Sequence, residues 1–264
     1  MVKTNTPEQV RIAGNDFHTN ALPDPFDELD LLYRPKLQVL PHVLDGRAGE
    51  AVLDQQGQSC TGHAVAALID TVNSLPYADE PSHGPPRYRK THASPYMLYA
   101  LARKYDEFPG NADVGSSLRG ALKGWYHHGV CSATKWKFNT EPEPELEDPR
   151  FIALCMKTPL GAYYRVNARR IDDMQSALTE LNAVAASAAI HDGWRQPIVE
   201  THGGKAIQVI RPGDDPQPMG GHAFLLAGYN EVGFLVQNSW GTRWGHKGYA
   251  TLPYADWLAN AYDA

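Results

Sequence analysis

The chain has few cysteines, no long apolar run and no long cluster of basic residues. Three Cys among 264 residues are too few for a secreted protein built around disulfide bonds. No run of 18 apolar residues occurs, so we expect no transmembrane helix and no membrane partner. The formal net charge of −6 and the dispersed Lys and Arg residues argue against nucleic acid as the main partner.

The first residues lack a targeting feature as well. The stretch Met1–Pro7 has no apolar core of the kind that a secretory signal needs. Together with the small number of cysteines, this absence favours folding in the cytoplasm with free thiols, and export by a route without a signal peptide stays open. A composition with 42% hydrophobic and 20% charged residues is that of an ordinary globular protein, with enough core material for one large or two small domains.

Metal-binding patterns are absent too, although the chain contains 11 His. It has no His-Glu-x-x-His and no Cys-x-x-Cys spacing. The adjacent His127 and His128 would face different ways on a helix. We therefore predict neither a metal site nor another cofactor.

The most informative stretch is Gly220–Gly245. Two short apolar runs, 224–226 and 234–236, are separated by Asn230–Gly233, which predicts a β-hairpin. His222 precedes the first run and Asn238 follows the second, so both can lie at one rim of the hairpin. There the Asn amide oxygen can accept the ring N–H of the imidazole. That contact fixes the tautomer and leaves the other ring nitrogen to act as a base.

The group on which such a base would act is Cys60. Polar and Gly-containing residues lead into it, and a helical pattern follows, in which Ala64, Leu68, Val72 and Leu75 have the spacing of one buried face. Cys60 is thus predicted at a helix N-terminus, where free N–H groups and the helix dipole favour the thiolate. A nearby His would stabilise that thiolate further, and the same amides could bind an oxyanion.

The remaining elements are predicted from periodicity and capping residues. Ser94-Pro95 should open a helix, and a further helix should begin after Gly115-Ser116-Ser117 and stop at Gly129. A third helix is expected from Ile171. Strands are expected at Tyr163–Val166, Val184–Ile190 and Ala206–Ile210, and a short helix near 254–258.

These residues resemble the papain-like cysteine peptidases. The resemblance rests on Asn-Ser-Trp-Gly-x-x-Trp-Gly at 238–245, on the preceding Gly-Gly-His-Ala, and on a Gln-rich turn before Cys-Thr-Gly-x-Ala, which is similar to the bacterial branch. Two features depart from the plant and lysosomal pattern: Thr61 replaces an aromatic residue after the nucleophile, and no Cys lies three residues before Cys60. The Cys60–His222 separation of 162 residues (222 − 60) implies loop insertions.

The resemblance implies an α+β fold with two lobes and an active-site cleft between them. A helical lobe (51–150) would carry Cys60, and a β-rich, barrel-like lobe (155–264) would carry His222 and Asn238, both within a catalytic domain at 51–264. It further implies that Trp240 shields the His–Asn contact, and that Gly115 and Gly221 bind the substrate backbone. The partner implied is a protein or peptide substrate.

An oxyanion-binding Gln is also implied, six residues before the nucleophile in the family. Here Gln55 lies five residues before Cys60 and Gln56 four. Gln55 is favoured because it needs a single deletion, and Gln56 stays open as the alternative. His63, one helical turn after Cys60, is a competing base, but the matching family position is a buried core residue.

Residues 1–50 form a leader that is rich in Pro and Asp. It can pack as an extended arm, or it can carry a strand that blocks the cleft. The predicted function is a cysteine peptidase that works through an acyl-enzyme and processes a specific protein. The alternative is an interaction module with the same fold and a decayed site. The chain can also be one domain of a longer polypeptide.

Overall fold

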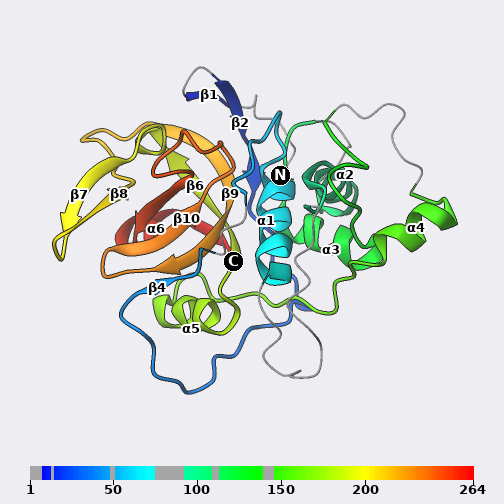
Figure 1. Cartoon of the computed structure of the whole chain (residues 1–264), viewed down its shortest axis with the longest axis horizontal. Coiled ribbons are helices and arrows are strands. Elements are labelled where there is room, and N and C mark those ends of the chain that lie inside the picture. Colours follow the sequence, from blue (N-terminus) through cyan, green and yellow to red (C-terminus); the bar gives the residue numbers. More distant parts are fainter. Residues whose placement is uncertain (1–7, 13–14, 48–50, 75–91, 109–112, 139–145) are drawn as a thin grey trace.

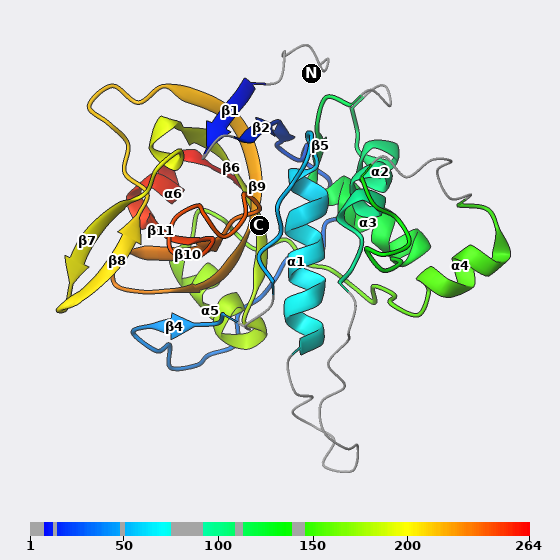
Figure 2. The ribbon, with the colours of Figure 1, turned by 45° about the horizontal axis from the view of Figure 1, so that its top comes forward.

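The computed structural model of the chain describes residues 8–12, 15–47, 51–74, 92–108, 113–138 and 146–264. Helix α1 (Cys60–Ser74) stands between a β-sheet lobe on one side and the helices of a second lobe on the other (Figures 1 and 2). Residues of α1 contact strand β9 (Pro218–Tyr229) of the first lobe and helix α2 (Pro95–Tyr105) of the second. The helix that carries Cys60 therefore joins the two lobes.

The helical lobe consists of α1, α2, α3 (Leu118–His128) and α4 (Pro149–Cys155). As predicted, Ser94 caps α2 by accepting a hydrogen bond from the Met97 amide, and Pro95 is the first helical residue. Helix α3 is capped by the Ser117 side chain and ends at Gly129, whose φ of +65° suits glycine.

The predicted buried face of α1 is wrong in its second half. Ala64 is buried, but Leu68 is only partly buried and the Val72 side chain is 48% exposed. Leu75 lies outside the described residues. The first two turns are instead buried on every side, because α1 is packed against both α2 and β9. A one-sided apolar pattern does not describe a helix that is enclosed from two directions.

The β-rich lobe contains one large sheet with strand order β12-β6-β9-β10-β11-β8-β7, and β4 (Leu44–Asp45) pairs with β9. The predicted hairpin is formed by β9 and β10, with Val236 opposite Leu226. Helices α5 (Ile171–Leu181) and α6 (Tyr254–Asn260) pack against this sheet. The other strands are β6 (Val184–His191), β7 (Ile198–His202), β8 (Lys205–Val209), β10 (Gly233–Gln237), β11 (Tyr249–Pro253) and β12 (Ala261–Asp263).

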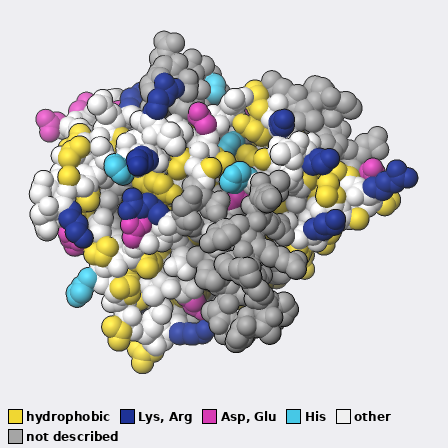
Figure 3. Space-filling view, viewed as in Figure 1, with side chains coloured by type: hydrophobic (Ala, Val, Ile, Leu, Met, Phe, Trp, Pro, Cys, Tyr) yellow, Lys and Arg dark blue, Asp and Glu magenta, His cyan; other side chains and the backbone are white. Residues whose placement is uncertain are grey.

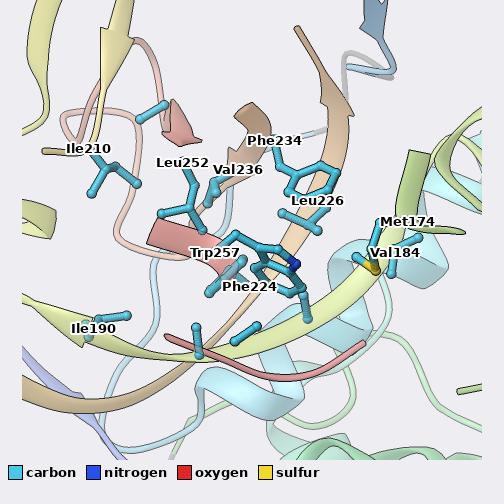
Figure 4. Packing of buried hydrophobic residues seen from close by; sticks show 14 of the residues in the cluster. Met174, Val184, Ile190, Ile210, Phe224, Leu226, Phe234, Val236, Leu252 and Trp257 are labelled. Atoms are coloured by element: carbon cyan, nitrogen blue, oxygen red, sulfur yellow. The ribbon is translucent and has the colours of Figure 1, made fainter. Parts of the chain in front are cut away.

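The core of this lobe is built from the hairpin itself. Phe224 and Leu226 of β9 and Phe234 and Val236 of β10 are at most 1% exposed, and they surround Trp257 of α6 (Figure 4). Burying several large side chains stabilises the folded state by about 2 kcal/mol for each one. The hairpin that carries His222 and Asn238 is thus anchored in the best-packed part of the lobe.

Two sequence predictions in this half need correction. Tyr163–Val166 is not a strand, because only Arg165 forms a bridge, with Leu32 of the leader. Strand β7 was not predicted; its side chains are largely exposed, so it lacks the apolar pattern on which strand prediction depends.

The N-terminal residues form short strands and then an extended arm. Strands β1 (Glu8–Ile12) and β2 (Asn15–Thr19) form a hairpin, and β3 (Ala21–Leu22) then pairs in parallel with β5 (Ser116–Ser117) of the helical lobe. We call residues 18–22 the cleft segment, because they lie between the lobes. Residues 23–47 continue as an arm around α5 to β4 (Figure 1).

No helix in the described part of the chain has the length and apolar character needed to span a membrane. On the face shown in Figure 3, Lys and Arg side chains are scattered among hydrophobic and polar ones and form no single basic patch.

Candidate active site

Cys60 is the first residue of α1 and is fully buried. The backbone N–H groups of Cys60 and Thr61 at the helix N-terminus are directed at its sulfur. The amide of Ala223, which follows His222 on β9, is directed at the sulfur too. The two lobes therefore bring Cys60 and the His222 segment into contact across 162 residues of sequence (222 − 60).

His222 and Asn238 form the contact that the hairpin predicted. His222 Nε2 lies 2.8 Å from Asn238 Oδ1, and both residues are buried. The same oxygen accepts the Ser239 amide at 2.8 Å, which fixes it as the acceptor and His222 Nε2 as the donor. Within the described residues, His222 Nδ1 is buried without a hydrogen-bond partner. That nitrogen is the one left to exchange a proton with a neighbouring group.

Aromatic rings enclose the imidazole. The Trp240 ring stacks on His222 with centroids 4.7 Å apart and planes at 27°. Trp194 meets the imidazole edge-on at 6.1 Å, a residue that the sequence did not single out. Its carbonyl accepts the Trp244 indole N–H at 2.6 Å, which ties this wall to the Trp-Gly repeat at 240–245. The rings keep water away from the His222–Asn238 hydrogen bond, which strengthens it.

The structure places Gln55, and not Gln56, at the site. Gln55 is 2% exposed, whereas Gln56 points to solvent. Ser239 Oγ donates to Gln55 Oε1 at 2.7 Å and turns the Nε2 amide towards the cleft segment. There Gln55 Nε2 donates to the His18 carbonyl at 3.1 Å. Sequence reasoning missed Ser239, although it lies within the Asn-Ser-Trp-Gly run.

The cleft segment fills the space beside Cys60. The backbone N–H of Asn20 is directed at the Cys60 sulfur, and the Asn20 side chain donates to the Val114 carbonyl. A hydrogen bond from Thr19 Oγ1 to the Met219 carbonyl fastens the segment to the other lobe. The segment thus occupies the region expected to receive substrate.

Glycines allow the backbone of the cleft segment to come this close. A Cβ atom at Gly115 would collide with the Asn20 carbonyl, and one at Gly221 would collide with the Ala21 carbonyl. Gly115 also has a φ of +96°, a conformation that favours glycine. The two predicted substrate-binding glycines therefore line opposite sides of one extended backbone.

Burial controls the ionisation of both reactive groups in this state. It raises the pKa of the Cys60 thiol, against the lowering effect of the surrounding amides. Burial also lowers the pKa of His222 to about 4, with the Asn238 hydrogen bond acting in the opposite direction. With the cleft segment in place, the neutral thiol and imidazole are favoured at neutral pH.

Two residues near Cys60 have structural roles. His63 Nδ1 lies 2.8 Å from the Ser59 carbonyl, and burial lowers the pKa of His63 to about 4, which fits the expected core position. Thr61 Oγ1 lies 2.6 Å from Ser116 Oγ, a buried contact that ties α1 to β5. A large aromatic residue at position 61 would displace this contact. Among the described residues, no group of three or more His, Cys, Asp or Glu is arranged to hold a metal ion.

Comparison with known proteins decides the family. The sequence profile described as papain family cysteine protease matches residues 114–256, which is more than half of the chain. The chain belongs to the papain family of cysteine proteases. The matched range contains His222 and Asn238 but not Cys60, so the assignment of Cys60 as the nucleophile stays a prediction, which the geometry described above supports. Placement in the bacterial branch stays a prediction.

Individual relatives agree with this assignment. A peptidase C1-like protein of Acanthamoeba polyphaga mimivirus is 26% identical over 210 residues, which cover 74% of this chain. The chain spans 61% of the length of that relative. Xylellain, a cysteine protease from Xylella fastidiosa, superposes with a TM-score of 0.75 at 22% identity, covering 98% of this chain and 96% of xylellain.

A second solved structure is that of digestive procathepsin L 3 from Tenebrio molitor larval midgut. It superposes with a TM-score of 0.65 at 18% identity, covering 93% of this chain and 75% of that one. These structural likenesses confirm the predicted α+β, two-lobe papain-like fold.

Proposed function

We propose that this protein is a cysteine endopeptidase in which Cys60 is the nucleophile and His222 is the acid and base. The observation that carries the proposal is the hydrogen bond of 2.8 Å between His222 Nε2 and Asn238 Oδ1. It leaves Nδ1 free of other partners among the described residues, next to the strand whose Ala223 amide faces the Cys60 sulfur. A decayed interaction module would have no need to keep all three groups in register.

The proposed reaction begins when the Cys60 thiolate attacks a peptide carbonyl carbon and forms a C–S bond. Gln55 Nε2 and the Cys60 amide hold the oxyanion that develops. His222 then donates its proton to the departing nitrogen as the C–N bond breaks. In the second half, His222 takes a proton from water, whose oxygen attacks the acyl carbon, and the C–S bond breaks. Asn238 keeps the imidazole in position throughout.

The state described here is proposed to be latent. The cleft segment directs the Asn20 amide at the Cys60 sulfur, and the His18 carbonyl takes the donor of Gln55 that the oxyanion would need. A substrate cannot enter until this segment moves. In this proposal, residues 1–50 restrain a catalytic domain formed by residues 51–264.

A narrow substrate range and a cytoplasmic location complete the proposal. Cys60, Cys131 and Cys155 are all free thiols, which suits a reducing compartment. A protease restrained by its own leader and acting on a defined protein would show little turnover of general substrates.

Thiol labelling tests the nucleophile directly. An active-site-directed alkylating reagent at mildly acidic pH reacts only with a thiolate that its surroundings stabilise. We expect peptide mapping to find the label on Cys60 once the cleft segment is loosened by Thr19→Val and Asn20→Ala. Cys131 and Cys155 serve as internal controls. Labelling of all three thiols at equal rates would contradict an activated Cys60.

A further inference from the structure

The arm that follows the cleft segment is held by three cations of the catalytic domain. We call Arg119 and Lys123 of α3, together with Arg165, the cationic clamp. Asp30 of the arm lies between the two guanidinium groups: its carboxylate accepts Arg119 Nε at 3.1 Å, Arg119 Nη2 at 2.6 Å and Arg165 Nη1 at 3.0 Å. Asp27 lies 3.8 Å from Lys123 Nζ.

The clamp is a built site and not a chance surface pairing. The Arg119 side chain is 3% exposed and that of Asp30 12%, so this pair is largely withdrawn from water. Two hydrogen bonds from one guanidinium to one carboxylate give a geometry that lysine cannot reproduce. If the buried guanidinium lost this carboxylate, its N–H groups would have no hydrogen-bond acceptor in place of water. An unpaired buried charge of this kind destabilises the protein.

Charge balance shows what remains when the arm leaves. The catalytic domain supplies two carboxylates to the clamp. Glu107 contacts Arg119 at 3.5 Å and Lys123 at 2.7 Å, and Asp263 contacts Arg165. Three cations against two carboxylates leave one positive charge (3 − 2). Asp27 and Asp30 reverse this sign when the arm is docked. Asp24, which accepts the Arg119 backbone N–H at 3.1 Å, brings a third carboxylate of the arm beside the clamp.

We propose that the cationic clamp is a binding site for acidic segments of protein substrates, and that Asp27 and Asp30 occupy it as a substitute ligand. This inference rests on the proposed protease function, because the arm must leave before a substrate can bind. The arm reaches the clamp directly after β3, the strand paired with β5 beside Gly115. A substrate bound along β5 therefore extends towards the clamp, which selects for two carboxylates three residues apart (30 − 27).

Cleavage of matched peptides tests this selection. The protein with Thr19→Val, Asn20→Ala and Asp30→Asn, in which the cleft segment and the arm are loosened, is mixed with quenched fluorescent peptides. The peptides carry an Asp-x-x-Asp pair, or Asn-x-x-Asn in its place, at each position on either side of the scissile bond. We expect kcat/KM to be about tenfold higher for the Asp peptide on one side only, the magnitude of one charge-assisted pair. Lys123→Gln and Arg165→Gln should each reduce the ratio of the two rates, whereas Arg150→Gln, an exposed charge on α4, should leave it unchanged.

The ratio of kcat/KM for the Asp and Asn peptides separates the proposed protease function from the proposed selection by the clamp. If Asp and Asn peptides are cleaved at equal rates at every position, the clamp does not select substrate, although the protease is real. If neither peptide is cleaved, the protease function fails, and binding is then measured alone. In that assay, the 264-residue chain with Thr19→Val, Asn20→Ala, Asp30→Asn and Cys60→Ala is mixed with a fluorescein-labelled peptide of residues 21–32 and with its Asp27→Asn, Asp30→Asn counterpart. Binding is followed by fluorescence anisotropy. A higher affinity for the acidic peptide supports the clamp as a binding site for acidic segments, and equal affinities overturn that proposal.

Discussion

Two segments meet at Cys60, and they are held in different ways. The β9–β10 hairpin brings His222 and Asn238 to the site on an apolar core that includes Phe224 and Phe234. The cleft segment reaches the same place through backbone contacts with glycines and polar side-chain hydrogen bonds. The apolar core holds the β9–β10 hairpin, which we call the permanent segment. The cleft segment, which we call the cover, is held by hydrogen bonds that water can replace. We therefore propose that the hairpin stays in place while the cleft segment, which covers Cys60, can be released.

The largest expected effect comes from a cavity in the apolar core that anchors the β9–β10 hairpin. Phe224→Ala removes a ring that is 1% exposed beside Trp257 and should lower the free energy of unfolding by about 3–5 kcal/mol. Chemical denaturation measures this change. Leu258→Ala, at a side chain that is 39% exposed, is the control and should change stability by about 0.5 kcal/mol or less. Equal effects of the two variants would mean that the hairpin is not anchored by its core.

A smaller effect is expected from Asn238, which follows β10 at the end of the hairpin opposite its turn. Asn238→Ala removes the acceptor of His222 Nε2 and should lower kcat/KM about 100-fold, within the range that positioned acid–base catalysis contributes. Gln237→Ala, its neighbour on β10, is the control because Gln237 contacts Tyr249 and not His222. If Asn238→Ala kept full activity, Asn238 would not orient the imidazole.

Loosening the cover should have a moderate effect. Thr19→Val and Asn20→Ala together remove the two side-chain hydrogen bonds that hold the cleft segment. Each such bond contributes about 1 kcal/mol, so the labelling rate of Cys60 should rise about tenfold or more. Thr201→Val on the exposed strand β7 is the matched control. An unchanged labelling rate would show that the cover does not limit access to the thiol.

The smallest expected effect is the pH dependence with which the arm and the cleft segment dock on the catalytic domain. Burial and the neighbouring Asp263 raise the pKa of Asp24 to about 6 when the arm is docked. The docked state then binds a proton more tightly than the free arm, so docking is fully favoured below the ordinary Asp pKa and weakens as the pH rises through about 6. Asp24→Asn should abolish this change.

The measurement is the ratio of Cys60 labelling rates in wild type and in Asp24→Asn at each pH, because the ratio cancels the titration of the thiol itself. It should be near one in acid and increase severalfold as the pH passes about 6. A constant ratio would mean that Asp24 does not respond to docking.

The sequence predicted the permanent segment better than the cover. The apolar runs of the hairpin, the Ser94 and Ser117 caps and the Gly129 stop depend on local patterns, and each is found where it was expected. The path of the cleft segment could not be read in the same way. It is fixed by close approaches to Gly115 and Gly221, which lie about a hundred or more residues further along the chain.

Individual residues show the same limit. Gln55 and Gln56 are adjacent and chemically equal, and the folded chain distinguishes them by burying Gln55 against Ser239 and the His18 carbonyl. Val72 has helical spacing but is exposed, since the burial of α1 is decided by two other elements. Arg119 and Asp30 carry no local motif at all, and only the folded chain brings them together.

Peptide hydrolysis by the protein with Thr19→Val and Asn20→Ala, with and without Cys60→Ala, tests the central claim most directly. A mixed fluorogenic peptide library is followed under reducing conditions across pH. The account predicts turnover that follows a bell-shaped pH profile and disappears with Cys60→Ala. Turnover that survives Cys60→Ala, or no turnover together with an ordinary Cys60 thiol, would contradict it.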